Sequence, residues 1–251
     1  MHRFAVCFSL LMAVAVSHPA EAGFAEDEVL LYAFDDSTSS STATEEHSSG
    51  LDLTLNGSTI SDSQTLDSLL AKSWDSGNSL YCDGTTATAT HSDQNTFEPE
   101  DMTLSTWVYI PTFSDCNGNC TVVSKGSNSS NPNGYWLYVN SVGVLTVNIA
   151  NGGSSTTVSG GTLSQGTWHH VVTSLKNQTV SLYLDGQIKA LQNMSHYIAY
   201  SSEEFMLCGI DSSTDYFKGY IDEFRLWDGD MSSTEVAELY DWYTDSDSDG
   251  Y

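Results

Sequence analysis

The stretch Gly166–Gly186, GTWHHVVTSLKNQTVSLYLDG, decides the fold class. Apolar and polar residues alternate through Trp168–Leu175 and again through Thr179–Leu184, which is the pattern of strands with one buried face. Asp185-Gly186 closes the second run. Asp-Gly after an alternating run is a strong hairpin signal because both turn positions need φ > 0. The stretch therefore predicts antiparallel β-structure that packs on a core.

Similar short runs recur along the chain between turns rich in Gly, Asn, Ser and Asp. They are Val29–Phe34, Leu51–Leu55, Ser79–Asp83, Thr85–Thr90, Met102–Pro111, Thr121–Lys125, Tyr135–Val139, Val142–Ile149, Phe205–Gly209 and Tyr216–Trp227. Short strands at this spacing predict an all-β sandwich. We expect helices at Thr65–Lys72 and after the capping box Ser232-x-x-Glu235, and a polar loop at Gly152–Gly161.

The first residues have the pattern of a secretion signal. An apolar run, Phe4–Val16, precedes Ala20-Glu21-Ala22, a cleavage site of the A-x-A kind. The run is too short to span a bilayer, and no later segment is long and apolar enough. We therefore expect a signal peptide over residues 1–22, a single domain over residues 27–242, an acidic tail over residues 243–251, and a secreted protein without a membrane span.

The formal net charge is −26, with only seven Lys plus Arg. Such a surface repels phosphate backbones and anionic lipid headgroups, which argues against nucleic-acid or membrane-surface partners. Solubility or a salty habitat explains the acid without any ligand. Calcium coordination by part of the acid is the alternative, and the two explanations are compatible.

Four cysteines remain outside the signal segment, at positions 82, 116, 120 and 208. An even number in a secreted chain predicts two disulfides, with three possible connectivities. Cys116 and Cys120 flank a tight Asn-Gly-Asn turn, which favours a local bridge and leaves Cys82 to pair with Cys208. A zinc site would need a second Cys-x-x-Cys pair or suitably placed histidines, and neither occurs.

Four sequence blocks now form a pattern that resembles a known family. They are Tyr81–Gly84, Leu104–Val108, Gly166–Val171 with Leu182–Gly186, and Phe217–Trp227 followed by Met231-Ser232 and the closing helix. In this order they look like the laminin-G-like branch of the concanavalin A-like lectin/glucanase superfamily. The resemblance implies a jelly-roll sandwich of two antiparallel sheets with a short C-terminal helix, frequently with a calcium ion on the rim. It implies less about function, because the family includes lectins, adhesion modules and domains attached to hydrolases.

His169 and His170 suggest metal binding or catalysis. Adjacent strand residues point to opposite faces, so the pair cannot easily hold one ion. No Ser, Cys or second His stands at a spacing that would complete a catalytic triad, although triads assemble in space. We expect Trp168 and one histidine to pack between the sheets instead.

Four aspartates are candidate calcium ligands. By alternation, Asp222 shares a strand face with Phe224 and Leu226. If that face is inward, Asp222 is a carboxylate at the edge of the core that must be paired, hydrogen-bonded or metal-bound. Asp35 can meet it if the terminal strands adjoin, and carboxylates with backbone carbonyls are the ligands calcium prefers. Asp211 and Asp215 form a second acidic loop. The alternatives are a carboxylate that caps backbone N–H groups at Asp222 and a solvated turn at the loop.

A sugar-binding surface needs exposed aromatic rings beside amide and acidic groups. Trp136, Tyr138 and Asn140 share one face of the run Tyr135–Asn140 and adjoin the loop that contains Asn131 and Asn133. We predict these five residues as the ligand-binding set. Ordinary packing of the rings in the sandwich is the alternative.

The sequence thus predicts a secreted, non-catalytic module that recognises glycans or an extracellular partner and holds calcium. One alternative is a glycoside hydrolase or lyase of the same fold, but the Glu-x-Asp-x-x-Glu strand motif of the superfamily's retaining glucanases is absent. Another is an adhesive or structural module with a protein partner.

Overall fold

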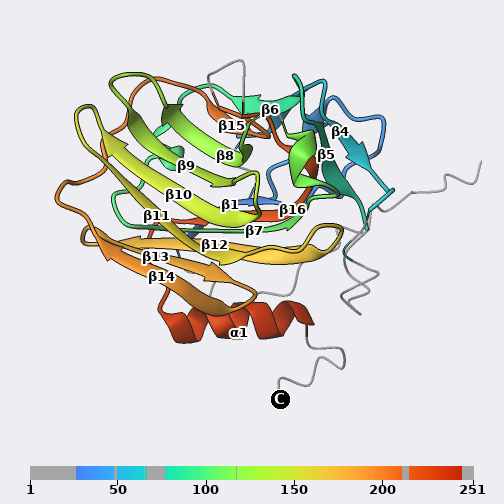
Figure 1. The fold of residues 1–251 in the computed structure, drawn as a ribbon. Coiled ribbons are helices and arrows are strands. Elements are labelled where there is room, and N and C mark those ends of the chain that lie inside the picture. Colours follow the sequence, from blue (N-terminus) through green and yellow to red (C-terminus); the bar gives the residue numbers. More distant parts are fainter. Residues whose placement is uncertain are drawn as a thin grey trace, which may run out of the picture.

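The computed structural model describes residues 27–47, 50–64, 66, 77–116, 118–210 and 215–244. In these residues two eight-stranded antiparallel sheets pack face to face (Figure 1). The 3-10 helices η2 (Asn95–Phe97) and η3 (Phe113–Asp115) lie in loops, and the α-helix α1 (Ser233–Thr244) ends the described chain. The predicted all-β sandwich is confirmed. No helix among the described residues is long and apolar enough to cross a membrane.

The first sheet, called the covered sheet below, contains the stretch Gly166–Gly186. Its strands are β1 (Glu28–Tyr32), β4 (Thr59–Ser61), β5 (Ser79–Asp83), β7 (Met102–Tyr109), β12 (Trp168–Lys176), β13 (Thr179–Leu184), β14 (Gln187–Asn193) and β16 (Lys218–Trp227). The order is β14-β13-β12-β7-β16-β5-β4, and β1 also pairs with β16. The β12–β13 turn is Asn177-Gln178, and Asp185-Gly186 turns into β14; all four residues have φ > 0. The central stretch is therefore part of a three-stranded meander.

The second sheet, called the open sheet, has the order β11-β10-β9-β8-β15-β6-β3-β2. Its strands are β2 (Thr42–Ala43), β3 (Leu53–Asn56), β6 (Thr88–His91), β8 (Cys120–Ser127), β9 (Asn133–Val139), β10 (Val144–Asn151), β11 (Ser155–Thr162) and β15 (Phe205–Leu207). β11 lies where we expected a polar loop, so that prediction was wrong. Alternation explains the strand, because Val158 is buried while Thr157 and Ser159 on either side are exposed.

The core fills the space between the sheets. Val180, Leu182 and Leu184 all face it, as the alternation of β13 predicts, and they meet open-sheet residues such as Leu137 and Phe205 in one cluster. Full burial of an aliphatic or aromatic side chain contributes roughly 1.5–3 kcal/mol. The continuous core therefore fixes the register of both sheets.

The helix α1 closes the outer face of the covered sheet (Figure 1). The predicted capping box is present, since Ser232 N donates to Glu235 Oε2 at 2.7 Å and Glu235 N donates to Ser232 Oγ at 3.3 Å. Val236, Leu239 and Tyr243 pack in a second cluster whose sheet residues include Trp107, Trp168, Val172, Tyr183 and Trp227. No described helix lies over the outer face of the open sheet.

This second cluster corrects one prediction. Trp168 belongs to it, and His170 contacts the rings of Trp107, Tyr240 and Tyr243. Both side chains therefore lie beneath α1 and not between the sheets. The polar face of β12 and β13 is covered by a helix that the strand pattern alone does not place.

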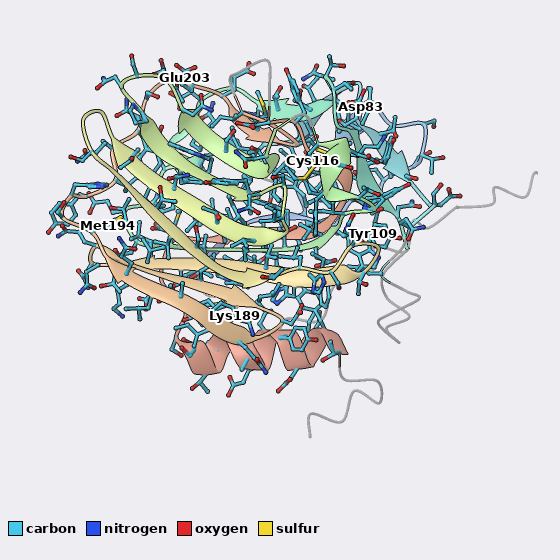
Figure 2. The ribbon with its side chains drawn as sticks, viewed as in Figure 1. Asp83, Tyr109, Cys116, Lys189, Met194 and Glu203 are labelled. Atoms are coloured by element: carbon cyan, nitrogen blue, oxygen red, sulfur yellow. A yellow bond between two sulfur atoms is a disulfide. The ribbon has the colours of Figure 1, made fainter. Side chains whose placement is uncertain are left out.

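Both predicted disulfides form. Cys82 in β5 pairs with Cys208, which follows β15, so this bridge links the covered sheet to the open sheet. Cys116 pairs with Cys120 across the short loop between η3 and β8, where Figure 2 labels Cys116. The predicted helix at Thr65–Lys72 lies outside the described residues apart from Leu66.

Candidate functional site

Two rows of side chains cross the outer face of the open sheet. Residues opposite each other on paired strands project to the same face, and the strand register aligns both rows. The first row is Thr42, Thr54, Thr90, Met206, Ser124, Trp136, Asn148 and Thr157. The second is Thr121, Tyr138, Thr146 and Ser159. None of these side chains is charged, and all except Met206 and Trp136 carry a hydroxyl or amide group.

Hydrogen bonds between neighbouring strands fix the polar groups of the rows. Thr157 Oγ1 donates to Asn148 Oδ1, and Asn148 Nδ2 donates to Tyr138 Oη at 3.4 Å. In the second row the hydroxyls of Thr146 and Ser159 are 3.0 Å apart. The groups are thus oriented by the sheet before any ligand arrives, which lowers the cost of binding.

Exposed and buried side chains are mixed along the rows, and Thr90, Thr121 and Asn148 are buried. Ser124 and Thr146 are each only 2% exposed. Trp136 and Tyr138 on β9 are half-buried, whereas Thr157, Ser159 and Thr54 nearer the sheet edges are exposed. The two aromatic rings lie on the outward face of β9, as the alternation predicts.

The predicted asparagines do not form one cluster with the rings. Asn140 Oδ1 accepts hydrogen bonds of 3.0 Å from both Val142 N and Val144 N, so it holds the β9–β10 turn. Asn133 begins β9 at the opposite end, and its side chain donates to Asn131 O at 3.4 Å. The strand therefore separates Asn140 from Asn131 and Asn133, with Trp136 and Tyr138 between them.

Sequence reasoning missed the amide and hydroxyl partners of the rings. Thr146 and Asn148 alternate with three core residues, Leu145, Val147 and Ile149. This alternation in the predicted hairpin indicates that Thr146 and Asn148 lie on the outer face of the strand. Thr157 and Ser159 lay in a segment whose Gly and Ser content suggested a loop. Pairing with β10 makes that segment a strand.

Asp222 does not share a face with Phe224 and Leu226, so this part of the prediction was wrong. A bulge shifts the register between Asp222 and Arg225, and Glu223 has φ 47°. Asp222 therefore pairs with Trp107 on the face beneath α1. Its Oδ1 accepts a hydrogen bond of 2.8 Å from Glu223 N.

Of the other predicted calcium ligands, the structure describes Asp35 and Asp215. The terminal strands do adjoin, because β1 pairs with β16, which leaves Asp35 just beyond that pairing. Asp215 Oδ1 accepts a hydrogen bond of 2.6 Å from Asn119 N and so caps the cysteine loop. Asp211 lies outside the described residues.

The described residues contain no group of three or more His, Cys, Asp or Glu side chains that could hold an ion. The predicted calcium site needs only two carboxylates together with backbone carbonyls. Asp222 accepts a backbone N–H, which fits the capping alternative for that residue. Calcium binding stays a prediction.

Ser164, His169 and Asp185 form a chain of contacts that sequence spacing did not reveal. His169 Nδ1 lies 2.9 Å from Asp185 Oδ2, and His169 Nε2 lies 2.8 Å from Ser164 Oγ. However, Nε2 also accepts the backbone N–H of Ser164 at 3.0 Å, so the lone pair that a general base needs is shared. The three residues tie the loop before β12 to the β13–β14 turn.

His170 is fully buried and points the other way. Its Nε2 lies 2.7 Å from Ser105 Oγ. Burial lowers the pKa of His170 to about 3, so the ring is neutral at physiological pH. This histidine belongs to the packing beneath α1 and not to a surface site.

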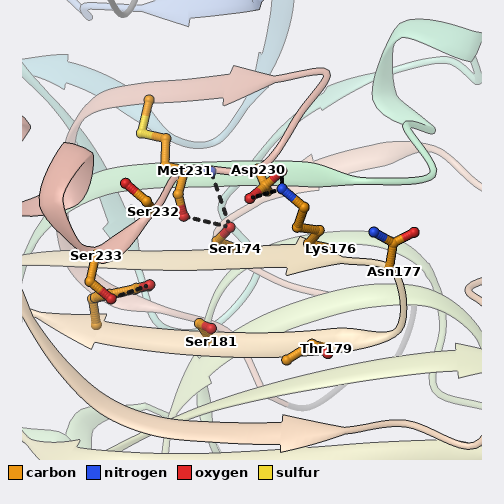
Figure 3. A pocket seen from close by; sticks show the side chains of 10 residues that line it. Ser174, Lys176, Asn177, Thr179, Ser181, Asp230, Met231, Ser232 and Ser233 are labelled. Atoms are coloured by element: carbon orange, nitrogen blue, oxygen red, sulfur yellow. Dashed lines mark hydrogen bonds and ion pairs between the residues drawn. The ribbon is translucent and has the colours of Figure 1, made fainter.

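A hollow opens between the start of α1 and the β12–β13 hairpin (Figure 3). Lys176 Nζ lies 2.8 Å from Asp230 Oδ1, and Ser174 Oγ donates to Met231 O at 3.2 Å. Tyr183 Oη and Ser233 Oγ are 3.2 Å apart. These polar groups already satisfy one another, which makes the hollow a weaker candidate than the open sheet.

Comparisons with known proteins agree with this architecture. None of the curated proteins matches the chain. The binding domain of Paraclostridial Mosquitocidal Protein 1 superposes with a TM-score of 0.64 at 15% identity, over 86% of this chain and 52% of that one. Domain 4 of AbnA, a GH43 extracellular arabinanase from Geobacillus stearothermophilus, solved with arabinotriose, superposes with a TM-score of 0.60 at 19% identity, over 86% of this chain and all of that one.

A sialidase from Trypanosoma rangeli also superposes, with a TM-score of 0.61 at 15% identity, over 85% of this chain and 32% of that one. The chain thus spans about half of the toxin domain and a third of the sialidase. At these identities the likeness concerns the fold. The family model described as "Concanavalin A-like lectin/glucanases superfamily" matches residues 83–237, more than half of the chain and most of both sheets. The chain therefore belongs to the concanavalin A-like lectin/glucanases superfamily.

Proposed function

We propose that the protein is a secreted, non-catalytic module that binds glycans on the outer face of the open sheet. The observation that carries the proposal is the position of Trp136 and Tyr138 among hydroxyl and amide groups on a face that no described helix covers. Aromatic rings offer an apolar platform to the CH faces of a sugar, while oriented hydroxyl and amide groups bond its hydroxyls.

The alternatives fit this face less well. A glycosidase needs two carboxylates on either side of the bond it cleaves, and neither row contains Asp or Glu. The core of a protein–protein interface is apolar and rich in aromatic anchors, whereas most side chains of these rows are Ser, Thr or Asn.

Two further observations support an extracellular glycan-binding role. Two disulfides are typical of proteins in oxidising, extracellular environments. Domain 4 of the arabinanase, which shares the fold, was solved with arabinotriose. The likeness extends to the fold alone, so it favours glycan binding but does not identify the sugar.

Glycan-array binding by the wild type and two variants tests the proposal. Trp136→Ala removes the ring from the row, and Tyr197→Ala is the matched control, because Tyr197 is an aromatic residue outside the rows that is 69% exposed. We expect Trp136→Ala to weaken binding about tenfold or more, which corresponds to about 1.4 kcal/mol, while the control binds as the wild type does. An array on which no glycan binds would contradict the function, and binding unaffected by Trp136→Ala would contradict the site.

A further inference from the structure

We infer that the ligand of the open sheet is an uncharged, extended glycan that runs across the strands along the first row. This inference rests on the proposed function and adds the class of glycan. Its basis is the distribution of charge over the described residues and the length of the uncharged row.

None of the described cations belongs to a row, but one of them, Lys189 in β14, packs beside Gly161 of β11 at the edge of the open sheet. Lys125 belongs to β8 but is 0% exposed and points into the sandwich, where Nζ lies 2.9 Å from Asp93 Oδ1 and 2.8 Å from Glu98 Oε1. Arg225 is buried beneath α1, where Nη2 lies 2.9 Å from Glu223 Oε2. Neither can reach a ligand on the outer face.

The other three described cations belong to the covered sheet. Lys176 in β12 pairs with Asp230, and Lys189 in β14 donates to Gln187 Oε1 at 3.0 Å. Lys218 in β16 donates to Tyr81 Oη at 2.9 Å. The described part of the open face thus lacks the Lys or Arg that would pair with a uronate, sulfate or sialate group.

The net charge of the protein also disfavours an acidic ligand. The formal charge of −26 produces an electrostatic field that repels polyanions before they make contact. An acidic glycan would have to overcome this repulsion and leave its own charges desolvated against Thr, Asn and Trp side chains, which costs free energy when no counter-charge is present. A neutral glycan meets neither cost.

The length of the row indicates an extended ligand. From Thr157 on β11 to Thr90 on β6 the row crosses five strand intervals, and adjacent strands are about 4.8 Å apart, so the distance is roughly 24 Å. Thr157, Trp136 and Met206 are exposed or half-buried and lie on alternate strands of this row, so they can contact successive sugar units. Asn148, Ser124 and Thr90 between and beyond them are buried. Affinity should therefore rise with chain length.

Titration calorimetry with matched oligosaccharides tests the inference. The probes are galacturonan fragments and their fully methyl-esterified forms, which are charged and uncharged versions of one backbone. Gluco-, xylo-, manno- and arabino-oligosaccharides are added, and every probe has two or six units. We expect binding only among the neutral probes, at least tenfold tighter for six units than for two, and nearly unchanged between 50 and 500 mM NaCl. Trp136→Ala should weaken it and Tyr197→Ala should not.

Three results would overturn the inference in distinguishable ways. Binding of galacturonan that weakens as salt rises would refute the uncharged class and leave the proposed function standing. Equal affinity for two and six units would refute the extended mode. If no oligosaccharide and no glycan on the array binds, the proposed function falls together with the inference.

Discussion

Tyr243 in α1 donates a hydrogen bond of 3.0 Å to Glu223 Oε2 in β16, across the boundary between the helix and the covered sheet. The same oxygen accepts Arg225 Nη2 at 2.9 Å, and Arg225 also lies 3.3 Å from Glu28 in β1. The guanidinium stacks near the rings of Trp242 and Tyr243. A buried ionic cluster therefore fastens the helix over one sheet.

Replacement of Tyr243 by Phe should loosen the helix without affecting the open sheet. A hydrogen bond to a charged group contributes about 1.5–3 kcal/mol, and because Glu223 keeps Arg225 we expect a loss near the lower value. Urea denaturation followed by fluorescence measures the free energy of unfolding, and glycan binding should be unchanged. Tyr197→Phe is the control, expected within about 0.5 kcal/mol of the wild type. Equal stability of both variants would show that the contact does not anchor α1.

Buried His170 should make the protein less stable in mild acid. Burial lowers its pKa to about 3, from an ordinary value near 6.5. Between these values the unfolded chain binds a proton that the folded protein does not, so stability falls as the pH drops from about 6.5 to 3. The slope is at most about 1.4 kcal/mol per pH unit.

His170→Gln should flatten this slope between pH 4.5 and 6, measured as free energy of unfolding in urea. Other shifted groups act elsewhere or in the opposite sense. The Glu28 hydrogen bond raises the pKa of His47, so its contribution is present at low pH and is lost as the pH rises. Although burial opposes it, backbone N–H groups of Thr86, Ala87 and Thr85 hold the pKa of Asp83 well below its usual value, so that group acts below about pH 4. A variant with the wild-type slope would contradict the assignment to His170.

The sequence predicts the sandwich well because alternation is a local property that the core enforces. Val180, Leu182 and Leu184 face the core as expected. The four cysteines that follow the signal segment pair as their spacing suggests. Local alternation does not predict the features that depend on contacts between distant parts of the chain. The bulge at Glu223 reverses the face of Asp222, and one inserted residue has this effect because the side-chain period of a strand is two.

The candidate site was only half predictable for the same reason. Trp136 and Tyr138 follow from alternation within one strand, but their neighbours Asn148 and Thr157 depend on which strands pair. The contact between His169 and Ser164 depends on how the loop before β12 folds back. Sequence spacing encodes neither relationship directly.

The two disulfides should contribute unequally to stability. Cys82–Cys208 closes a separation of 126 residues, and Cys116–Cys120 closes a separation of four. On the chain-entropy model the long bridge stabilises by about 4–5 kcal/mol and the short one by about 2 kcal/mol. Urea denaturation of the paired Cys→Ala variants, C82A/C208A and C116A/C120A, measures both. The model would be wrong for this protein if the short-loop variant lost as much stability as the long-loop variant.

Calcium titration tests the predicted site at Asp35 and Asp222. An ion bound only by the folded protein stabilises it by RT ln(1 + [Ca²⁺]/Kd), about 2.7 kcal/mol at one hundred times Kd. The site prediction thus expects a higher Tm in calcium than in EDTA, and a Tm of D35N or D222N that no longer responds to the ion. Asp83→Asn is the control, because Asp83 is not a predicted ligand. Its carboxylate accepts the backbone N–H groups of Thr85, Thr86 and Ala87, so this variant should lose stability equally with and without calcium. If the wild type unfolds at one temperature in calcium and in EDTA, the calcium prediction is wrong.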